Sequence, residues 1–441
     1  MNVLLHTFGC KANQYDTEVV RQRLEAAGCR IVETSLEADA AVVNSCTVTH
    51  VGEAKLRGFV RRLARARPGI RTVVMGCAAA VDDGRLAMLP GVAAVVGGAA
   101  DAAVAEALGV PVGPARPLRS FTGHGRAWLK VQDGCDEHCT FCATVLARGA
   151  SRSRRPEDLV REAERLAAVH AEIVLTGVHI GSYGLDLDGR WTLSSLVALL
   201  AGRVSGVRFR LTSIEATELD DTLIELMATA PDRVAPHLHA PLQSGSDRVL
   251  RRMGRHWYTA GAYRRNVERL AARVAPLGLG ADILVGFPGE SEADHRATAR
   301  MVEELPFTYL HVFPYSPREG TAAPRLGPPA GSAATRERSA ELRALGEAKA
   351  AAYRRARAGG PADLVLEARR AGEREAVTED YLSASVPADA PWVLGRSRVA
   401  ARLVARGGAL AGEDLGAAAA ACGRREDRAV EGMASSGAVS A

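Results

Sequence analysis

The segment with the most distinctive chemistry holds three cysteines, Cys135, Cys139 and Cys142, in the spacing C-x3-C-x2-C just beyond a predicted strand. Three cysteines can bind three irons of a [4Fe-4S] cluster, but a cluster saturated by protein needs a fourth thiolate, and none lies nearby. The pattern therefore predicts one iron open to a small molecule. S-Adenosylmethionine suits this iron, because its amino and carboxylate groups can chelate it and its sulfonium can be reduced to yield a 5′-deoxyadenosyl radical. The alternative is a zinc site in which His138 is the fourth ligand.

A second set of cysteines is spread over the N-terminal region. Cys10, Cys46 and Cys77 each stand one or two residues beyond a predicted strand. Ligands in open parallel sheets bind at the carboxyl ends of the strands, so this placement predicts that the three thiols gather at one point and hold a second cluster. Cys29, behind a helix-ending glycine, and Cys422, in the tail, are predicted to be structural or incidental.

The N-terminal region must position that second set. Short β-branched runs at residues 3–6, 40–43 and 72–75 alternate with amphipathic segments, which predicts a parallel sheet with crossover helices. Asp16 is the predicted N-cap of the first helix, and Gly28 is its predicted end.

A longer strand–helix series follows and carries the first set. Pro156 fits the first turn of a helix that runs to about residue 170, and Ser291 with Asp294 resembles a capping box. Six strand–helix units indicate a partial (β/α) barrel, because a complete one has eight. The strands are expected at 128–131, 173–175, 207–211, 237–239, 281–285 and 310–313.

The chain as a whole is predicted to be an α/β protein with three ordered regions. Short runs at 364–366, 376–385, 392–394 and 399–404 indicate a small OB-like β-barrel after the partial barrel. The tail has too little apolar bulk to order itself. The expected divisions are 1–98 (open parallel α/β domain), 99–125 (linker), 126–358 (partial barrel plus helical extension), 359–413 (β-barrel) and 414–441 (flexible tail).

The composition is that of an ordinary globular protein with a sizeable core, since 24% of the 441 residues are charged and 47% are hydrophobic. No apolar run approaches the roughly 18 residues that span a bilayer, and no secretory signal opens the chain. We therefore expect a cytoplasmic protein with no membrane partner. In that reducing compartment, eight cysteines favour metal binding or catalysis over disulfides.

The net charge of +5 is weak support for a polyanionic partner. Two basic clusters are interpreted either as solvated faces or as phosphate contacts to RNA. The first comprises Lys55, Arg57, Arg61, Arg62, Arg65, Arg67 and Arg71, and the second Arg148, Arg152, Arg154 and Arg155. Tyr381 and Trp392 are the candidates for base stacking in the C-terminal barrel, and each is predicted to be core instead.

With both sets of cysteines considered, the chain resembles the radical-S-adenosylmethionine methylthiotransferases from Met1 to about Glu413. One departure is Thr144-Val145, where members often carry Ile-Pro beside the cluster loop. Further matching segments lie at or beyond the carboxyl ends of predicted barrel strands. They are residues 147–154, 175–181, 237–245, 282–290 and 313–321.

This resemblance implies a radical-S-adenosylmethionine barrel followed by a TRAM domain, a small RNA-binding module. It implies two [4Fe-4S] clusters, one that cleaves S-adenosylmethionine and one that carries sulfur methylated by a second molecule of the cosubstrate. The implied partners are tRNA and an electron donor such as flavodoxin or ferredoxin. The backbone expected to cradle the cosubstrate surrounds Thr176, Gly177, Gln243, Ser244, Gly286 and Phe287.

Three substrates occur within this family, and the segment Gly-Cys-Lys-Ala-Asn-Gln-Tyr-Asp at residues 9–16 bears on the choice. It looks like the group that replaces the C2 hydrogen of N6-threonylcarbamoyladenosine at tRNA position 37 with a methylthio group. The alternatives are N6-isopentenyladenosine at that position and an aspartate of a ribosomal protein, whose groups typically have Gln-Met or Pro-Lys after the cysteine. A non-enzymatic iron–sulfur or zinc RNA-binding protein is the alternative from another class.

Overall fold

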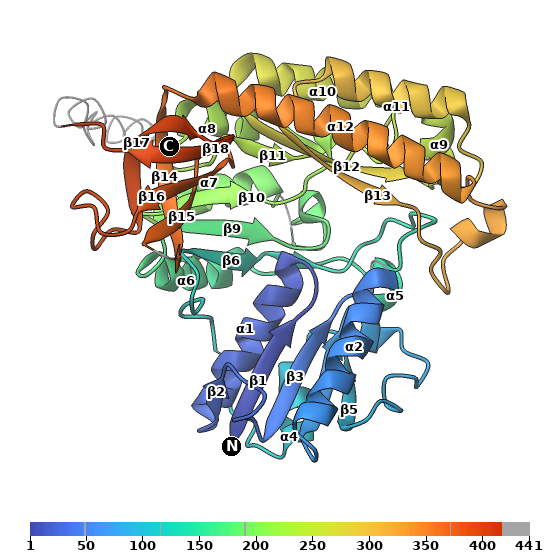
Figure 1. The fold of residues 1–441 in the computed structure, drawn as a ribbon, viewed down its shortest axis with the longest axis vertical. Coiled ribbons are helices and arrows are strands. Elements are labelled where there is room, and N and C mark those ends of the chain that lie inside the picture. Colours follow the sequence, from blue (N-terminus) through green and yellow to red (C-terminus); the bar gives the residue numbers. More distant parts are fainter. Residues whose placement is uncertain (48–49, 115, 189–190, 371, 417–441) are drawn as a thin grey trace, which may run out of the picture.

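The structure is a computed structural model that describes residues 1–47, 50–114, 116–188, 191–370 and 372–416. Figure 1 shows an N-terminal domain in blue, a central partial barrel in green to orange, and a small β-barrel in red at one end of the central barrel. Cys422 and residues 417–441 lie outside the described residues. No helix in the described part of the chain is long and apolar enough to cross a membrane.

The N-terminal domain is a parallel sheet with helices on both faces. Its elements are β1 (Asn2–Thr7), α1 (Lys11–Ala26), β2 (Arg30–Val32), β3 (Ala40–Ser45), α2 (His50–Ala66), β4 (Arg71–Gly76), α3 (Cys77–Ala80), β5 (Val92–Gly97) and α4 (Asp101–Leu108). The strand order is β2-β1-β3-β4-β5. One face packs on α2 through Leu56, Val60 and Leu63, and the other face packs on α1 and α4. The three predicted strands are confirmed, and β2 and β5 extend the sheet at its two edges.

The predicted start of the first helix is wrong. Helix α1 begins at Lys11 with Cys10 as its N-cap, so Asp16 lies in the second turn. Asp16 is buried there because it pairs with two cations of the central domain, Lys130 at 2.5 Å and Arg148 at 2.9 Å. Its carboxylate thus joins two domains and does not cap a helix.

The predicted end of this helix is confirmed, whereas part of the predicted linker is wrong. Gly28, in the left-handed region at a φ of +81°, follows the last turn of α1 as predicted. Helix α4, however, lies within the stretch 99–125 that was expected to be a linker. Its residues Val104 and Leu108 are buried against the N-terminal sheet, so this part of the stretch belongs to the core of that domain.

The central domain is a partial barrel whose six predicted strands are confirmed. Its elements are β6 (Arg126–Lys130), β7 (Gln132–Asp133), α5 (Thr144–Arg148), β8 (Arg152–Ser153), α6 (Pro156–Ala167), β9 (Glu172–Thr176), η1 (Ile180–Ser182), α7 (Leu193–Arg203), β10 (Arg208–Leu211), η2 (Ala216–Glu218), α8 (Asp221–Thr229), β11 (His237–His239), α9 (Asp247–Arg252), α10 (Ala260–Arg273), β12 (Gly278–Val285), α11 (Glu292–Glu304), β13 (Tyr309–Pro314), η3 (Ala323–Leu326) and α12 (Ser332–Arg357). The strands form two parallel sheets, β10-β9-β6 and β11-β12-β13. Isolated bridges from Phe209 to Val234 and from Ser213 to His239 connect the two sheets.

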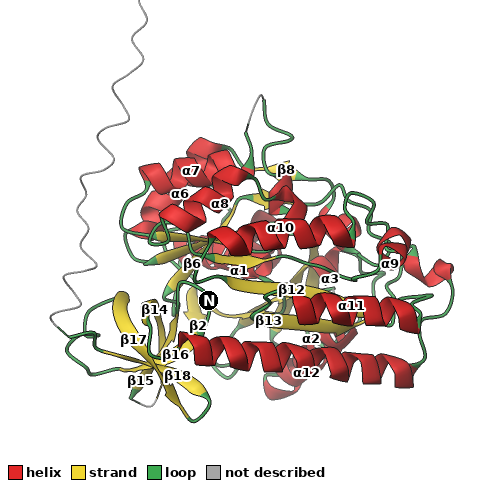
Figure 2. Cartoon of the chain, turned by 90° about the horizontal axis from the view of Figure 1, so that it is seen from above, coloured by secondary structure: helices red, strands yellow, loops and turns green. Residues whose placement is uncertain are grey.

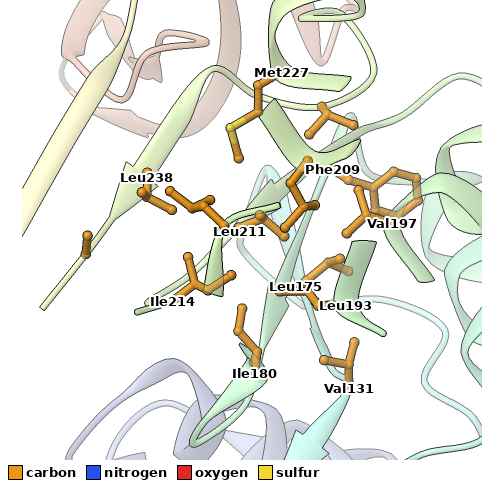
Figure 3. Close-up of a cluster of buried hydrophobic side chains, with 14 of the residues drawn as sticks. Val131, Leu175, Ile180, Leu193, Val197, Phe209, Leu211, Ile214, Met227 and Leu238 are labelled. Carbon is orange, nitrogen blue, oxygen red and sulfur yellow. The ribbon is translucent and has the colours of Figure 1, made fainter. Parts of the chain in front are cut away.

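Helices cover the outer side of this barrel (Figure 2). Pro156 occupies the first turn of α6, and Ser291 with Asp294 forms the capping box of α11, both as predicted. The strands bury their outward residues against the helices. Figure 3 shows this packing for Leu175, Phe209, Leu211 and Leu238 of the strands, Leu193 and Val197 of α7, and Met227 of α8.

The C-terminal unit is a closed barrel in the order β14-β15-β16-β18-β17. Its strands are β14 (Pro361–Arg370), β15 (Glu373–Val377), β16 (Ser383–Pro387), β17 (Arg398–Arg406) and β18 (Ala409–Glu413). The run predicted at 376–385 is divided between two strands, and the strand predicted at 392–394 is wrong, because those residues form a turn. Trp392 and Val393 are apolar there because they pack on the barrel core.

A buried ion network, here called the barrel floor, closes the amino-terminal end of the central barrel. Glu172 of β9 is fully buried and accepts hydrogen bonds from Arg208 Nε and Arg210 Nε, each at 2.7 Å. Burial alone would raise the pKa of Glu172, but Arg210 and Arg208 hold it well below its usual range. The C-terminal barrel covers this network, with Asp363 at 3.1 Å from Arg208 and the Tyr381 ring at 5.2 Å from Arg210.

Candidate functional site

Cys135, Cys139 and Cys142, here called the loop cysteines, lie between β7 and α5, at the carboxyl ends of the barrel strands. Backbone hydrogen bonds anchor the loop. The Cys135 N–H donates to Gly149 O at 3.0 Å, and the Thr140 N–H donates to Met253 O at 2.8 Å. The loop is therefore held both by the segment after α5 and by the residue that follows α9.

Two cationic side chains face the loop cysteines. Buried Arg255 donates from Nη1 to Cys139 Sγ at 3.4 Å, and His179 Nδ1 lies 4.0 Å from Cys135 Sγ. Burial would lower the pKa of His179, but hydrogen bonds to Cys135 and Glu218 raise it to about 10. Burial raises the pKa of Cys139 to about 12 against the opposing effect of Arg255. These cations are placed to compensate negative charge on sulfur.

Cys10, Cys46 and Cys77, here called the sheet cysteines, converge at the carboxyl edge of the N-terminal sheet. Asn13 Oδ1 lies 3.6 Å from Cys10 Sγ and 3.7 Å from Cys77 Sγ. Cys46 reaches the same place from β3, because a Cβ on Gly9, whose φ is +127°, would lie only 3.0 Å from Cys46 Cβ. Burial, and to a smaller extent the nearby Cys10 and Cys46, raise the pKa of Cys77 to about 11. The structure thus brings three thiols from three strand ends together.

Arg148 connects the two sets of cysteines. It ends α5, a few residues after the loop cysteines, and its Nε donates to Cys77 Sγ at 3.2 Å. Its Nη1 donates to Asp133 at 3.0 Å, and its Nη2 donates to Asn13 at 2.8 Å and to Asp16 at 2.9 Å. With only 3% of this side chain exposed, every arm of the guanidinium is used inside the interface between the two domains.

A cavity of about 210 Å³ lies beside both sets of cysteines. Its lining includes Cys142 of the loop, Thr47 next to Cys46, and Gln243 and Asp282 from the inner side of the barrel. A small molecule or a base held in this cavity would therefore contact residues of both domains.

Three of the residues predicted to cradle the cosubstrate lie at this end of the barrel. Gln243 lines the cavity and has a left-handed φ of +62°. Thr176 is buried at the end of β9, and Gly177 follows it. A Cβ on Gly177 would lie 2.6 Å from Gln132 O, so glycine is required for the strand end to approach the cysteine loop.

The other three residues of that set are occupied by structural contacts. Ser244 is buried and lies 3.4 Å from the Thr298 hydroxyl. The Gly286 N–H donates to Glu290 at 3.0 Å. Phe287 is fully buried in a small apolar cluster, so its side chain is not available to a ligand. A role for these three in cosubstrate binding stays a prediction.

Several of the side chains suggested for RNA contact instead make contacts within the protein. Arg148 is buried, and Arg154 pairs with buried Glu162 at 2.9 Å, so these two members of the second basic cluster serve the domain interface. Tyr381 packs on His237 with ring centroids 4.4 Å apart, and Trp392 packs on the C-terminal core. Both rings are partly buried and pack on the protein, and their having no stacking role stays a prediction.

Both sets of cysteines fit an iron–sulfur cluster. Each set has one buried arginine donating to a sulfur, Arg255 to Cys139 and Arg148 to Cys77. Each guanidinium is held by a carboxylate, Glu215 for Arg255 and Asp16 for Arg148, and directs a further N–H at sulfur, which suits thiolates bound to metal. The imidazole beside the loop cysteines is that of His179, whereas His138 is exposed, which does not favour a zinc site built on His138.

Several residues of the site carry little or no signal in the sequence. Arg148 stands among other arginines in the sequence, and only its position in the segment 147–154 distinguishes it. Asn13 lies in the segment that follows Cys10 but was not singled out. Arg255 has no local signal, because its contact with Cys139 spans 116 positions.

The family comparisons agree with this geometry. The Radical SAM superfamily matches residues 129–302, and Uncharacterized protein family UPF0004 matches residues 2–98. The radical-S-adenosylmethionine methyltransferase TsrM from Kitasatospora setae has a similar fold, with a TM-score of 0.52 and 15% identity over 71% of this chain and 72% of that one. The central domain is therefore a radical-S-adenosylmethionine barrel.

Closer relatives define the family. Threonylcarbamoyladenosine tRNA methylthiotransferase MtaB of Bacillus subtilis is 38% identical over 80% of this chain and 81% of that protein. Its counterpart in Thermotoga maritima is 35% identical over 74% and 77%, respectively. The tRNA-2-methylthio-N(6)-dimethylallyladenosine synthase of Frankia casuarinae is 38% identical over 77% and 66%. The chain belongs to the radical-S-adenosylmethionine methylthiotransferases and is an enzyme of that class.

Proposed function

We infer that this enzyme methylthiolates C2 of N6-threonylcarbamoyladenosine at position 37 of tRNA. The observation that carries this is the pair of cysteine sets joined through Arg148 beside one cavity. The reaction named for the relatives from Bacillus subtilis and Thermotoga maritima, together with the segment at residues 9–16, favours the threonylcarbamoyl substrate. Such a substrate is cytoplasmic, which agrees with the location expected from the sequence.

The loop cysteines would hold one [4Fe-4S] cluster and the sheet cysteines a second. When bound, these groups supply the electron for cleaving S-adenosylmethionine and the sulfur for transfer, with flavodoxin or ferredoxin as the reductant. A radical is needed because the C2–H of an adenine is too weakly acidic for a side-chain base working near neutral pH.

The protein's own residues position and insulate this chemistry. Arg255 and His179 compensate charge at the loop cysteines, and Arg148 does so at the sheet cysteines. Arg148 also fixes the distance between the two sets, because it bonds residues of both domains. The cavity between them, which includes Gln243 and Asp282, is where the adenosine and the cosubstrate would meet.

The test uses the full chain, reconstituted without oxygen and supplied with S-adenosylmethionine, a reductant and anticodon stem-loops. Mass spectrometry of the nucleosides should show the 2-methylthio derivative when the RNA carries N6-threonylcarbamoyladenosine. A second candidate substrate is the dimethylallyladenosine named for the Frankia relative. Product from that RNA alone would overturn the threonylcarbamoyl assignment, and product from neither RNA would overturn the tRNA assignment.

A further inference from the structure

Three polar side chains gather on the inner wall of the central barrel. His239 of β11 and His311 of β13 both donate to one oxygen of Asp282 on β12, between them, at 3.0 and 3.1 Å. They share one face because side chains alternate along each strand and the register pairs Asp282 with His311. We call these three residues the polar triad.

The triad is held rigidly from behind. Tyr309, two residues before His311, places its hydroxyl 3.1 Å from His239 Nδ1. There is room for this ring because residue 280 is glycine, and a Cβ there would lie 2.0 Å from a ring carbon. Both the orientation of His239 and the position of Asp282 are therefore set by the strands.

The front of the triad is open to the cavity. Asp282 lines the same cavity as Cys142, and the exposed fractions of the Asp282 and His311 side chains are 24% and 54%. Within the described residues, the second oxygen of Asp282 and Nε2 of His311 have no hydrogen-bond partner. Burial would raise the pKa of Asp282, but the hydrogen bonds from His239 and His311 hold it well below its usual range. The wall therefore presents an unpaired carboxylate oxygen to the cavity, and the half-exposed ring of His311 lies next to that oxygen on the same face of the sheet.

We propose that the polar triad recognises the N6 substituent of the adenosine and so determines which modified base is accepted. This inference rests on the proposed function. A threonylcarbamoyl group offers urea N–H donors to Asp282, and its hydroxyl can donate to Nε2 of His311, which is an acceptor because Nδ1 of that ring donates to Asp282. A dimethylallyl group offers no such donor, and covering the triad with hydrocarbon would leave the second oxygen of Asp282 buried without a partner, which is costly.

A metal ion is the competing occupant, since the ligand atoms of the triad all lie within 4.8 Å of one another. The recognition role is favoured because one nitrogen of each histidine already bonds to the Asp282 oxygen that a metal would need. The two occupants predict different results for the variants below.

The experiment measures binding of the reconstituted enzyme to two labelled anticodon stem-loops that differ only in carrying N6-threonylcarbamoyladenosine or plain adenosine at position 37. The wild type should prefer the modified loop by roughly tenfold or more, as expected for hydrogen bonds to charged groups. His311→Phe and Asp282→Asn should reduce this preference to about twofold, while His311→Gln, which keeps a polar amide, should retain part of it. His256→Phe, at an exposed histidine, is the matched control and should keep the full preference.

Cluster iron content and far-ultraviolet circular dichroism serve to show that the variants are intact. An unchanged preference in both His311→Phe and Asp282→Asn, or an equal loss of affinity for both loops, would overturn the inference. So would a divalent ion, beyond the cluster iron, that is bound by the wild type and lost in His311→Phe. Absence of methylthiolated product with the wild type would instead overturn the proposed function, which this binding comparison does not measure.

Discussion

The loop cysteines and the sheet cysteines reach similar arrangements by opposite routes. The loop cysteines are close in sequence and are anchored by backbone hydrogen bonds of their own loop. The sheet cysteines meet only because β1, β3 and β4 lie side by side in one sheet. What the two share is a buried arginine that donates to a sulfur, Arg255 in one and Arg148 in the other. Charge compensation, more than cysteine spacing, is thus the common requirement.

The largest effect is expected from removing a loop cysteine. Cys139→Ala should abolish both 5′-deoxyadenosine release and methylthiolation, because both depend on the cluster that this set would hold. Chromatography of the reaction mixture and nucleoside mass spectrometry measure the two products. Cys29→Ala is the control, since Cys29 packs in an apolar cluster of the N-terminal domain and both products should persist. Continued 5′-deoxyadenosine release by Cys139→Ala would contradict the assignment of the loop.

Removing a sheet cysteine should separate the two products. Cys77→Ala should lose methylthiolation but still release 5′-deoxyadenosine, because the loop cysteines stay intact. Iron analysis of the reconstituted variant should show about half the wild-type content, as expected if each set holds one cluster of equal size. The comparison between the sets would fail if Cys77→Ala lost both products while keeping its iron.

Arg148→Gln tests the connection between the sets. The change removes donors from Cys77 and Asp16, and Lys130 still neutralises part of the charge. We expect the free energy of unfolding to fall by about 2 kcal/mol and methylthiolation to fall more than 5′-deoxyadenosine release. Urea unfolding and the two product assays measure these effects. Arg152→Gln, at an exposed neighbour, is the control and should change the free energy of unfolding by less than about 0.5 kcal/mol. Equal losses of stability and methylthiolation in both variants would contradict a special role for Arg148.

The smallest effect concerns the basic face of α2, which follows the sheet cysteine Cys46 in the chain. Arg61 and Arg65 are exposed, so Arg61→Gln with Arg65→Gln should weaken tRNA binding a few-fold and lower the slope of log affinity against log salt by about 1 to 2. Binding isotherms at several salt concentrations measure this slope. An unchanged slope would mean that this face is merely solvated.

Local patterns in the sequence predict the loop cysteines, the six barrel strands and the ends of several helices, because each depends on neighbouring residues. Asp16 shows where this fails: a polar residue before an apolar stretch looks like an N-cap, yet its partners Lys130 and Arg148 lie in another domain. The strand predicted around Trp392 is wrong for a related reason. Apolar residues in a turn resemble a short strand, and their packing on the core of the C-terminal barrel cannot be read from neighbouring residues.

The polar triad lies beyond local prediction for the same reason. His239, Asp282 and His311 come from three strands, and only the parallel register of those strands makes them neighbours. Alternation along each strand predicts which residues share a face, but not which faces meet. The sheet cysteines can be predicted because each lies within three residues of a strand end, and the carboxyl ends of neighbouring parallel strands lie at one edge of the sheet.

The barrel floor determines from which end a ligand can enter the central barrel. Glu172 pairs with Arg208 and Arg210, and the C-terminal barrel covers these three residues. The interior of the central barrel is therefore closed at its amino-terminal end. A ligand therefore reaches the cavity from the end of the barrel where the cysteines lie, and not through the barrel floor. An RNA that also touches the C-terminal barrel must run along the outside of the central barrel to reach that end (Figure 1).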